Sequence, residues 1–124
     1  MKTNLIKDKS YSFAIRINSV ARWLRARKEF ELSSQVLRAG TGIGSNVEEA
    51  IAAVSRPDFV AKMGVASKEA RETHYWLRLL RDARVVPSRK IEPIVTECSE
   101  LVRILTAIMK TCQTNHKVEF FFNS

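Results

Sequence analysis

The sequence has few of the residues that interrupt regular structure or cross-link a chain. Its 124 residues include only 4 glycines, 3 prolines and 2 cysteines, too few turn-forming residues to separate the many short strands of an all-β protein. No run approaches the roughly 20 apolar residues that span a bilayer, and the first residues lack the apolar stretch of a secretory signal peptide. We therefore expect a cytoplasmic protein with no membrane partner.

What the sequence does contain is the composition of a globular protein, with 45% hydrophobic and 27% charged residues. A chain of this length supports one hydrophobic core, so residues 1–124 are expected to form a single domain. Apolar residues recur every three or four positions in four segments, which is the spacing of amphipathic helices. The predicted helices span residues 10–28, 30–54, 56–84 and 88–115, and a tail follows at 116–124.

Each predicted helix carries one apolar stripe. Ser10, Ser55 and Ser88 are predicted N-caps, because a serine hydroxyl can accept a hydrogen bond from a free N–H group of the first turn. Short connections make consecutive helices antiparallel, so the sequence predicts an all-α, up-down-up-down four-helix bundle. The stripes are Phe13, Ile17, Val20 and Leu24; Leu32, Val36, Ala39, Ile43, Val47, Ala50 and Val54; Phe59, Met63, Ala66, Ala70, Thr73, Leu77 and Leu80; and Ile91, Val95, Cys98, Val102, Leu105, Met109 and Cys112, which Ile94, Leu101 and Ile108 widen.

No set of residues has the spacing of a metal or catalytic site. A di-iron bundle needs a Glu-x-x-His motif on each of two helices, whereas the residue three positions after Glu72 is Tyr75. About 21 Å of helix separates Cys98 from Cys112, which is too far for a disulfide, and His74 is predicted to lie on a helix surface. We therefore expect a non-enzyme with no catalytic residue, no cofactor and no metal.

Small residues gather between positions 39 and 45. A phosphate-binding loop would need a preceding strand or a Gly-Lys-Ser/Thr sequence, and neither is present. Glycine costs about 1 kcal/mol inside a helix, so Gly40 and Gly44 are expected to let another helix approach, within the chain or in a second subunit; anion binding and a helix break are the alternatives. Polar residues nearby are expected to hydrogen-bond between helices or across a subunit boundary. The predicted structural or interface residues are Gln35, Gly40, Gly44, Asn46, Glu49, Glu69, Glu72, Tyr75 and Trp76.

Positive charge is concentrated near the start of the chain. Residues 1–28 have a net charge of +7, residues 29–54 have −3, and the whole chain has +8. A basic excess in one element indicates a polyanionic partner, and without a base-reading motif any binding would depend on shape and charge. The alternative is a solvated helix face. The predicted nucleic-acid-binding residues are Arg16, Arg22, Arg25, Arg27 and Lys28, with Trp23 among them, and Arg71, Arg78 and Arg81, which Arg84 continues.

Self-association is also expected. In a monomer, the strip of small residues would have no helix of a second subunit to contact. Trp76 and Leu79, which lie off the main stripe of the third helix, would likewise have no packing partner. The aromatic run Phe120–Phe122 is expected either to fold back on the bundle or to dock on a neighbouring subunit.

Six blocks follow one another along the chain: SYSFA (10–14), LSSQVLRAGT (32–41), IGSNVEEA (43–50), SRPDF (55–59), KEARET (68–73) and YWL (75–77). In this order they resemble the four-helix-bundle family of 23S rRNA intervening-sequence proteins. They cover about two thirds of the chain, and the last helix matches only in pattern. The family usually has Ser where Gly42 stands, and His74 is atypical too.

The resemblance implies a bacterial four-helix bundle that assembles into a ring, most often a homopentamer, with no established enzymatic activity. A related branch accompanies reverse transcriptases in diversity-generating retroelements and binds nucleic acid through a basic surface, so the resemblance implies both as partners. We expect a ring-forming, non-catalytic protein that binds structured RNA or a hybrid duplex. The alternative is a structural oligomer or protein-docking module, and a bundle that binds a small molecule or a metal is a third class.

Overall fold

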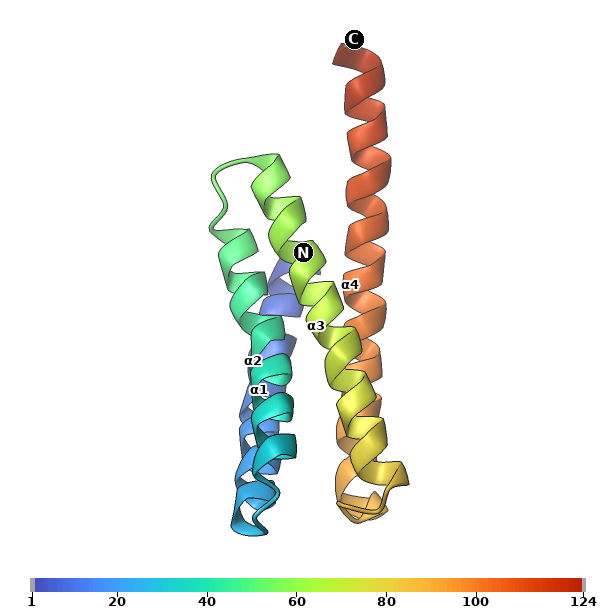
Figure 1. Cartoon of the computed structure of the whole chain (residues 1–124). Helices are drawn as coiled ribbons and strands as arrows, with labels where there is room; N and C mark the ends of the chain where they lie inside the picture. Colours follow the sequence, from blue (N-terminus) through green and yellow to red (C-terminus); the bar gives the residue numbers. More distant parts are fainter. Residues whose placement is uncertain (1, 124) are drawn as a thin grey trace.

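Four helices account for nearly all of the chain in the computed structural model, which describes residues 2–123, with side chains from 4 to 114. Each helix packs on the two beside it and on neither diagonal neighbour in the described part of the chain. This arrangement, seen in Figure 1, is the up-down-up-down bundle that the sequence predicts, so the all-α fold class is confirmed. The helices are α1 (Lys2–Ala26), α2 (Phe30–Ile51), α3 (Arg56–Asp82) and α4 (Ser88–Asn123).

The predicted stripes form the core. Phe13, Ile17 and Leu24 of α1 are wholly buried, and the stripes of α2 and α3 are buried from their second residue onward, apart from Val54. In α4 the buried face moves along the helix, so that Leu101 is fully buried while Val102 lies at the edge of the core. A straight α-helix drifts by about 20° per heptad relative to an apolar repeat of seven, which explains the move.

The start of α1 and the end of α2 differ from the sequence prediction. Ser10 is not an N-cap, because α1 begins at Lys2 and buries Ser10 in mid-helix, where its hydroxyl donates to the Lys7 carbonyl at 3.1 Å. The predicted end of α2 is also wrong, since the helix stops at Ile51 and Val54 is 98% exposed. Ala52 is the C-cap of α2, and Ser55, three residues on, has an extended backbone and caps α3.

The N-cap at Ser55 is confirmed. Its hydroxyl accepts a hydrogen bond from the Asp58 N–H at 3.3 Å, and Pro57 lies in the first turn of α3. At the start of α4, however, Ser88 is already helical, and the Pro87 carbonyl accepts the N–H of Ile91 at 3.2 Å. Pro87 therefore holds the cap position that the sequence assigned to Ser88.

The last helix is longer than predicted. It continues to Asn123 instead of ending at 115, so residues 116–123 are helical, and its end extends beyond the other helices (Figure 1). The side chains of Phe120–Phe122 lie outside the described residues.

The connections at 27–29 and 83–87 lie at the same end of the bundle, which we call the loop end (the lower end in Figure 1). Each connection contains one residue whose backbone lies in the left-handed region, Lys28 with φ 63° and Arg84 with φ 59°. The following N–H groups, of Glu29 and Val85, donate back into the helix at 2.9 and 3.0 Å. Glycine usually takes this position, whereas here two cations occupy it.

Candidate nucleic-acid interface

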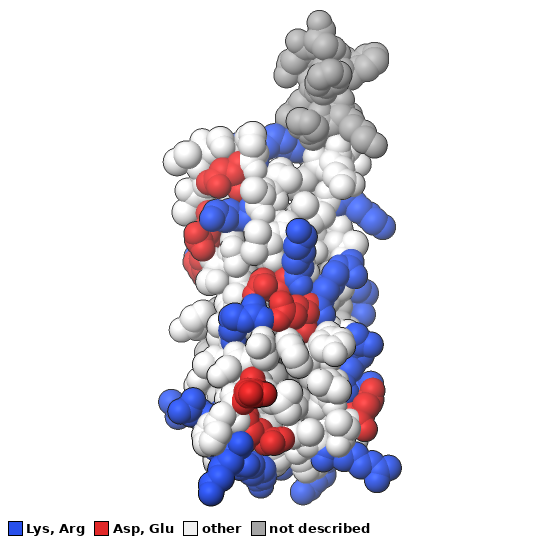
Figure 2. Space-filling model, in the orientation of Figure 1, with Lys and Arg blue, Asp and Glu red and all other residues white. Residues whose placement is uncertain are grey.

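Basic residues are concentrated at the loop end. Residues 22–31 and 81–92 together contain eight basic and four acidic residues, so 22 of the 124 residues carry half of the net charge of +8. Figure 2 shows Lys and Arg side chains gathered at this end of the visible face. Because helices α1 and α3 both end here, antiparallel packing brings together two basic segments that are far apart in the sequence.

The cations at the end of α1 are available to a ligand. Arg22, Arg25, Arg27 and Lys28 are all exposed, and none of them is paired with a carboxylate among the described side chains. The guanidinium of Arg27 lies over the Trp23 ring, 3.6 Å from its centroid. These four predicted binding residues therefore form one exposed group.

The other predicted binding residues have partners within the chain. Arg16 donates two hydrogen bonds to Glu97 of α4, at 2.6 and 3.1 Å, and these contacts hold the pKa of Arg16 above its ordinary value. Arg81 donates to Asp82 at 2.8 Å and to Glu92 at 3.1 Å. Arg16 thus joins the first helix to the last, and Arg81 joins α3 to the next helix, so part of the charge of both arginines is neutralised.

Arg71 and Arg78 make weaker contacts. Arg71 donates to the Thr106 hydroxyl at 3.1 Å, and Arg78 donates to the His74 carbonyl at 3.4 Å. Neither is paired with a carboxylate among the described residues, and both are exposed. The eight predicted binding residues thus lie in three places: one in the middle of α1, four at or just beyond its end, and three in the second half of α3.

A basic hollow of about 520 Å³ opens at the loop end. It is lined by Trp23, Arg27, Arg81, Arg84 and the connection 85–88. The start of α4 adds two exposed cations, Arg89 and Lys90, which sequence reasoning missed. The Lys90 Nζ lies 5.6 Å from the Trp23 ring centroid. The antiparallel order of the helices was the signal that could have found them.

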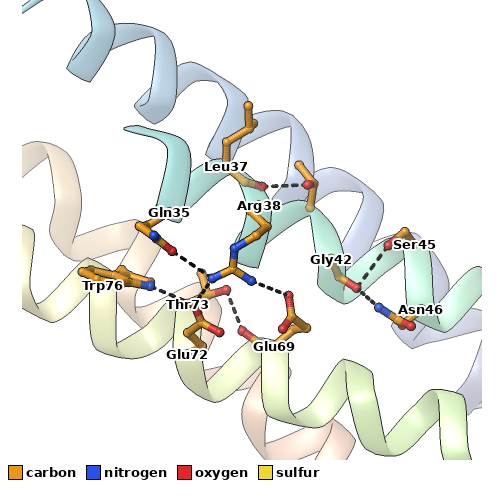
Figure 3. A network of polar contacts seen from close by, with 11 residues as sticks. Gln35, Leu37, Arg38, Gly42, Ser45, Asn46, Glu69, Glu72, Thr73 and Trp76 are labelled. Carbon is orange, nitrogen blue, oxygen red and sulfur yellow. Dashed lines mark hydrogen bonds and ion pairs between the residues drawn. The ribbon is translucent and has the colours of Figure 1, made fainter. Parts of the chain in front are cut away.

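A polar network joins α2 to α3 around Arg38 (Figure 3). Arg38 donates to the Gln35 side chain at 2.9 Å, lies 3.7 Å from Glu69 and hydrogen-bonds Glu72. Trp76 donates to the same Glu72 carboxylate at 3.1 Å. The structure therefore brings together four of the predicted structural residues, around an arginine that sequence reasoning did not single out.

The pKa values of the two carboxylates in this network are shifted in opposite directions. Burial raises the pKa of Glu69, the charge of Glu72 raises it further, and Arg38 opposes both. The hydrogen bond from Trp76 lowers the pKa of Glu72, burial opposes it, and Arg38 lowers it again. Gly42 faces Glu69, and any side chain at Gly42 would meet the Glu69 carboxylate.

The remaining predicted polar residues make local contacts. Asn46 donates to the Gly42 carbonyl of its own helix at 2.8 Å. Glu49 pairs with Lys62 of α3 at 3.4 Å, and the Tyr75 ring meets the Trp76 ring edge-on, with centroids 5.2 Å apart.

The small residues of α2 contact α1 of the same chain. A Cβ at Gly40 would lie 2.7 Å from two carbons of Ile17, and one at Gly44 would lie 3.4 Å from Ser10. Trp76 also packs partly against the core. The strip is therefore already filled within the chain, and it gives no argument for a second subunit.

No catalytic constellation is found among the described residues. His74, predicted on the surface, is half-buried and 3.0 Å from the Ser99 hydroxyl of α4, and burial, then Arg78 and Arg81, lower its pKa. Burial and Glu97 raise the pKa of Cys98 to about 12, so its thiol stays protonated. In this part of the chain no three His, Cys, Asp or Glu residues are placed to hold a metal, and no helix is long and apolar enough to cross a membrane.

Comparisons with known proteins agree with this four-helix architecture. The family model of the 23S rRNA-intervening sequence protein matches residues 2–107. A solved structure from Bacteroides thetaiotaomicron, a protein with unknown function from the S23 ribosomal protein family, is 44% identical. It superposes with a TM-score of 0.84 over 89% of this chain and 99% of that chain. No curated protein matches the sequence.

Proposed function

Since the chain belongs to the 23S rRNA-intervening sequence protein family, we propose that its loop end binds structured nucleic acid, RNA or a hybrid duplex, without catalysing a reaction. The observation that carries this proposal is the group of exposed, unpaired cations Arg22, Arg25, Arg27 and Lys28 beside Arg84. Arginine and lysine on a rigid helix end can contact successive phosphates, and most affinity for nucleic acid comes from such contacts. None of the elements with described side chains is arranged to read base edges, so sequence preference is expected to be weak.

We also propose that the protein self-associates. Tyr11 and Ile15 of α1 are 66% and 57% exposed, and Tyr75 and Leu79 of α3 are 52% and 37% exposed. Large apolar side chains on two outer faces support contact with further copies. The family resemblance implies a homopentamer, and a ring would repeat the loop end and so multiply its phosphate contacts.

Charge reversal tests the nucleic-acid part of the proposal. Arg22→Glu with Arg25→Glu should abolish binding to a labelled RNA duplex, because attraction and counterion release are both lost. The matched control is Lys7→Glu with Lys110→Glu, which makes the same charge change at exposed positions away from the loop end. Fluorescence anisotropy measures binding, and circular dichroism checks the fold.

The control variant should keep most of its affinity. If the folded Arg22→Glu, Arg25→Glu variant binds as tightly as the unmodified protein, the alternative of a structural oligomer without a nucleic-acid role is favoured. Four arginines already support that alternative, because Arg16 and Arg81 join helices and Arg71 and Arg78 contact neighbouring residues.

Sedimentation equilibrium at micromolar concentration tests self-association. Five copies of the 14.1 kDa chain would give about 70 kDa. A mass that stays at 14.1 kDa would contradict the proposed oligomer.

A further inference from the structure

An apolar groove of about 210 Å³ lies between α1 and α4, beside the basic hollow. Its walls include Val20 and Trp23 of α1 and Ile91 and Ile94 of α4, and Lys90 stands at its rim. Val20 and Ile91 are buried, and so is Val86 of the connection 83–87, so these parts of the wall are held by the core. The groove is smaller than the roughly 300–1,000 Å³ clefts that enclose drug-sized ligands, so it has room for one ring system.

The groove and the basic hollow share Trp23 and Val86, so they are adjacent. Arg27 is stacked on Trp23 at 3.6 Å, and Lys90 approaches the same ring to 5.6 Å. Arg84 lines the hollow without a carboxylate partner among the described residues. An apolar slot for a ring is therefore flanked by cations on the side of the hollow.

This combination fits a nucleotide better than an apolar side chain of a protein. Proteins hold unpaired bases by stacking them on aromatic rings or on guanidinium planes, and they hold the adjoining phosphates with Arg or Lys. A hydrophobic peptide would leave the surrounding cations without a partner. Bases within a duplex are stacked on each other, so only an unpaired base can enter the groove.

We infer that the groove beside Trp23 takes one unpaired nucleobase, at a strand end or in a bulge, while its phosphates lie on Arg27 and Arg84. The inference rests on the proposed function and names the part of the nucleic acid that this site recognises. It also gives the loop end a preference that charge alone would not give.

Three RNA hairpins of one stem sequence test the inference. The first has a blunt stem, the second adds one unpaired 3′ adenosine, and the third adds an abasic nucleotide in its place. The third hairpin has the extra phosphate without the base. We expect the adenosine hairpin to bind about fivefold or more tightly than the other two, as measured by anisotropy with the full chain.

Tryptophan fluorescence gives a second readout. In a Trp76→Phe variant only Trp23 emits, and stacking against a base should quench it with the adenosine hairpin alone. Ser19→Trp, which places a bulky ring at the groove, should remove the preference and leave blunt binding unchanged. Ser12→Trp, at an exposed position of the same helix, is the matched control and should keep the preference.

The outcomes separate this inference from the proposed function. If all three hairpins bind equally and Trp23 is not quenched, the base site is wrong while nucleic-acid binding stands. If none of them binds, both fail. If Trp23 is quenched by raising the protein concentration without RNA, a second copy of the chain fills the groove and the inference is overturned.

Discussion

At the scale of single residues, two glycines in helix interiors predict opposite effects of the same substitution. Gly40→Ala should destabilise the protein, because its Cβ would lie 2.7 Å from the stiff, buried side chain of Ile17, and overpacking of this kind costs about 1–3 kcal/mol. Gly64→Ala should stabilise it by up to about 1 kcal/mol, since the nearest atom, on Met109, is at an ordinary 3.7 Å.

The midpoints of urea unfolding for the two variants measure this difference. Gly64→Ala is the control for helix propensity, which is the same in both. Equal shifts in the two variants would mean that α1 does not press against Gly40 as the structure shows.

A substitution at Leu105 tests how α4 packs into the core. It is wholly buried, so Leu105→Ala should lower the free energy of unfolding by about 2–5 kcal/mol through lost burial and a cavity. Lys110→Ala, at an exposed position of the same helix, should change it by about 0.5 kcal/mol or less. An unchanged denaturation midpoint for Leu105→Ala would place the buried face of α4 elsewhere.

At the scale of helix pairs, the network around Arg38 makes the α2–α3 contact sensitive to acid. Because the pKa of Glu72 lies below its ordinary 4.5 in the folded protein, its ionised form stabilises the fold above that pH. This stability is lost as the pH falls through the folded pKa. The raised pKa of Glu69 has the opposite sign, since folding there disfavours the ionised form at neutral pH.

We therefore expect Glu72→Gln to lower the stability at pH 7, and to lose this effect when the pH falls well below 4.5. Glu69→Gln, the same change one turn away, should cost less at pH 7. Thermal unfolding from pH 3 to 7 measures both, and a larger loss for Glu69→Gln would contradict the assigned roles.

A substitution at Arg84, in the turn that ends α3, tests fold stability and nucleic-acid binding separately. A residue other than glycine in the left-handed region costs about 1–2 kcal/mol, whereas glycine loses more conformational entropy on folding, which costs roughly 0.5–1 kcal/mol. Arg84→Gly should therefore leave the free energy of unfolding unchanged or raise it by up to about 1 kcal/mol, while it weakens nucleic-acid binding. That outcome would indicate that the cation at this turn serves a ligand rather than the fold.

Ala83→Gly is the control, because Ala83 has an ordinary φ of −82°, and glycine there should only destabilise. Denaturation midpoints and anisotropy are measured on both variants. If Arg84→Gly lowers the midpoint as much as Ala83→Gly does, Arg84 supports the fold rather than a ligand.

At the scale of the whole molecule, the charge at the loop end predicts how binding depends on salt. Each phosphate neutralised on B-DNA contributes a log–log slope of about −0.9, so three contacts per chain should give a slope near −3 for a DNA duplex. A ring would multiply the slope by the number of subunits that reach the duplex. A salt titration by anisotropy measures it, and tight binding that ignores salt would contradict a phosphate-contacting surface.

The sequence by itself determined the features that depend on near neighbours along the chain. The three- and four-residue spacing placed Phe13, Ile43 and Leu77 in the core, because helical periodicity alone decides which side chains share a face. The N-cap at Ser55 was predicted for the same reason, since the cap and the N–H that it binds are three residues apart. The basic end of α1 was also visible as a run of charges.

Only the tertiary structure decided which of these charges are paired. Arg16 meets Glu97 across 81 positions of sequence, and Arg38 meets Glu72 across 34, because the rotation of each helix about its axis sets which side chains face one another. The same packing turned Ser10 from an expected cap into a buried residue against Gly44. It also joined the end of α1 to the start of α4, which made the groove and the hollow at Trp23.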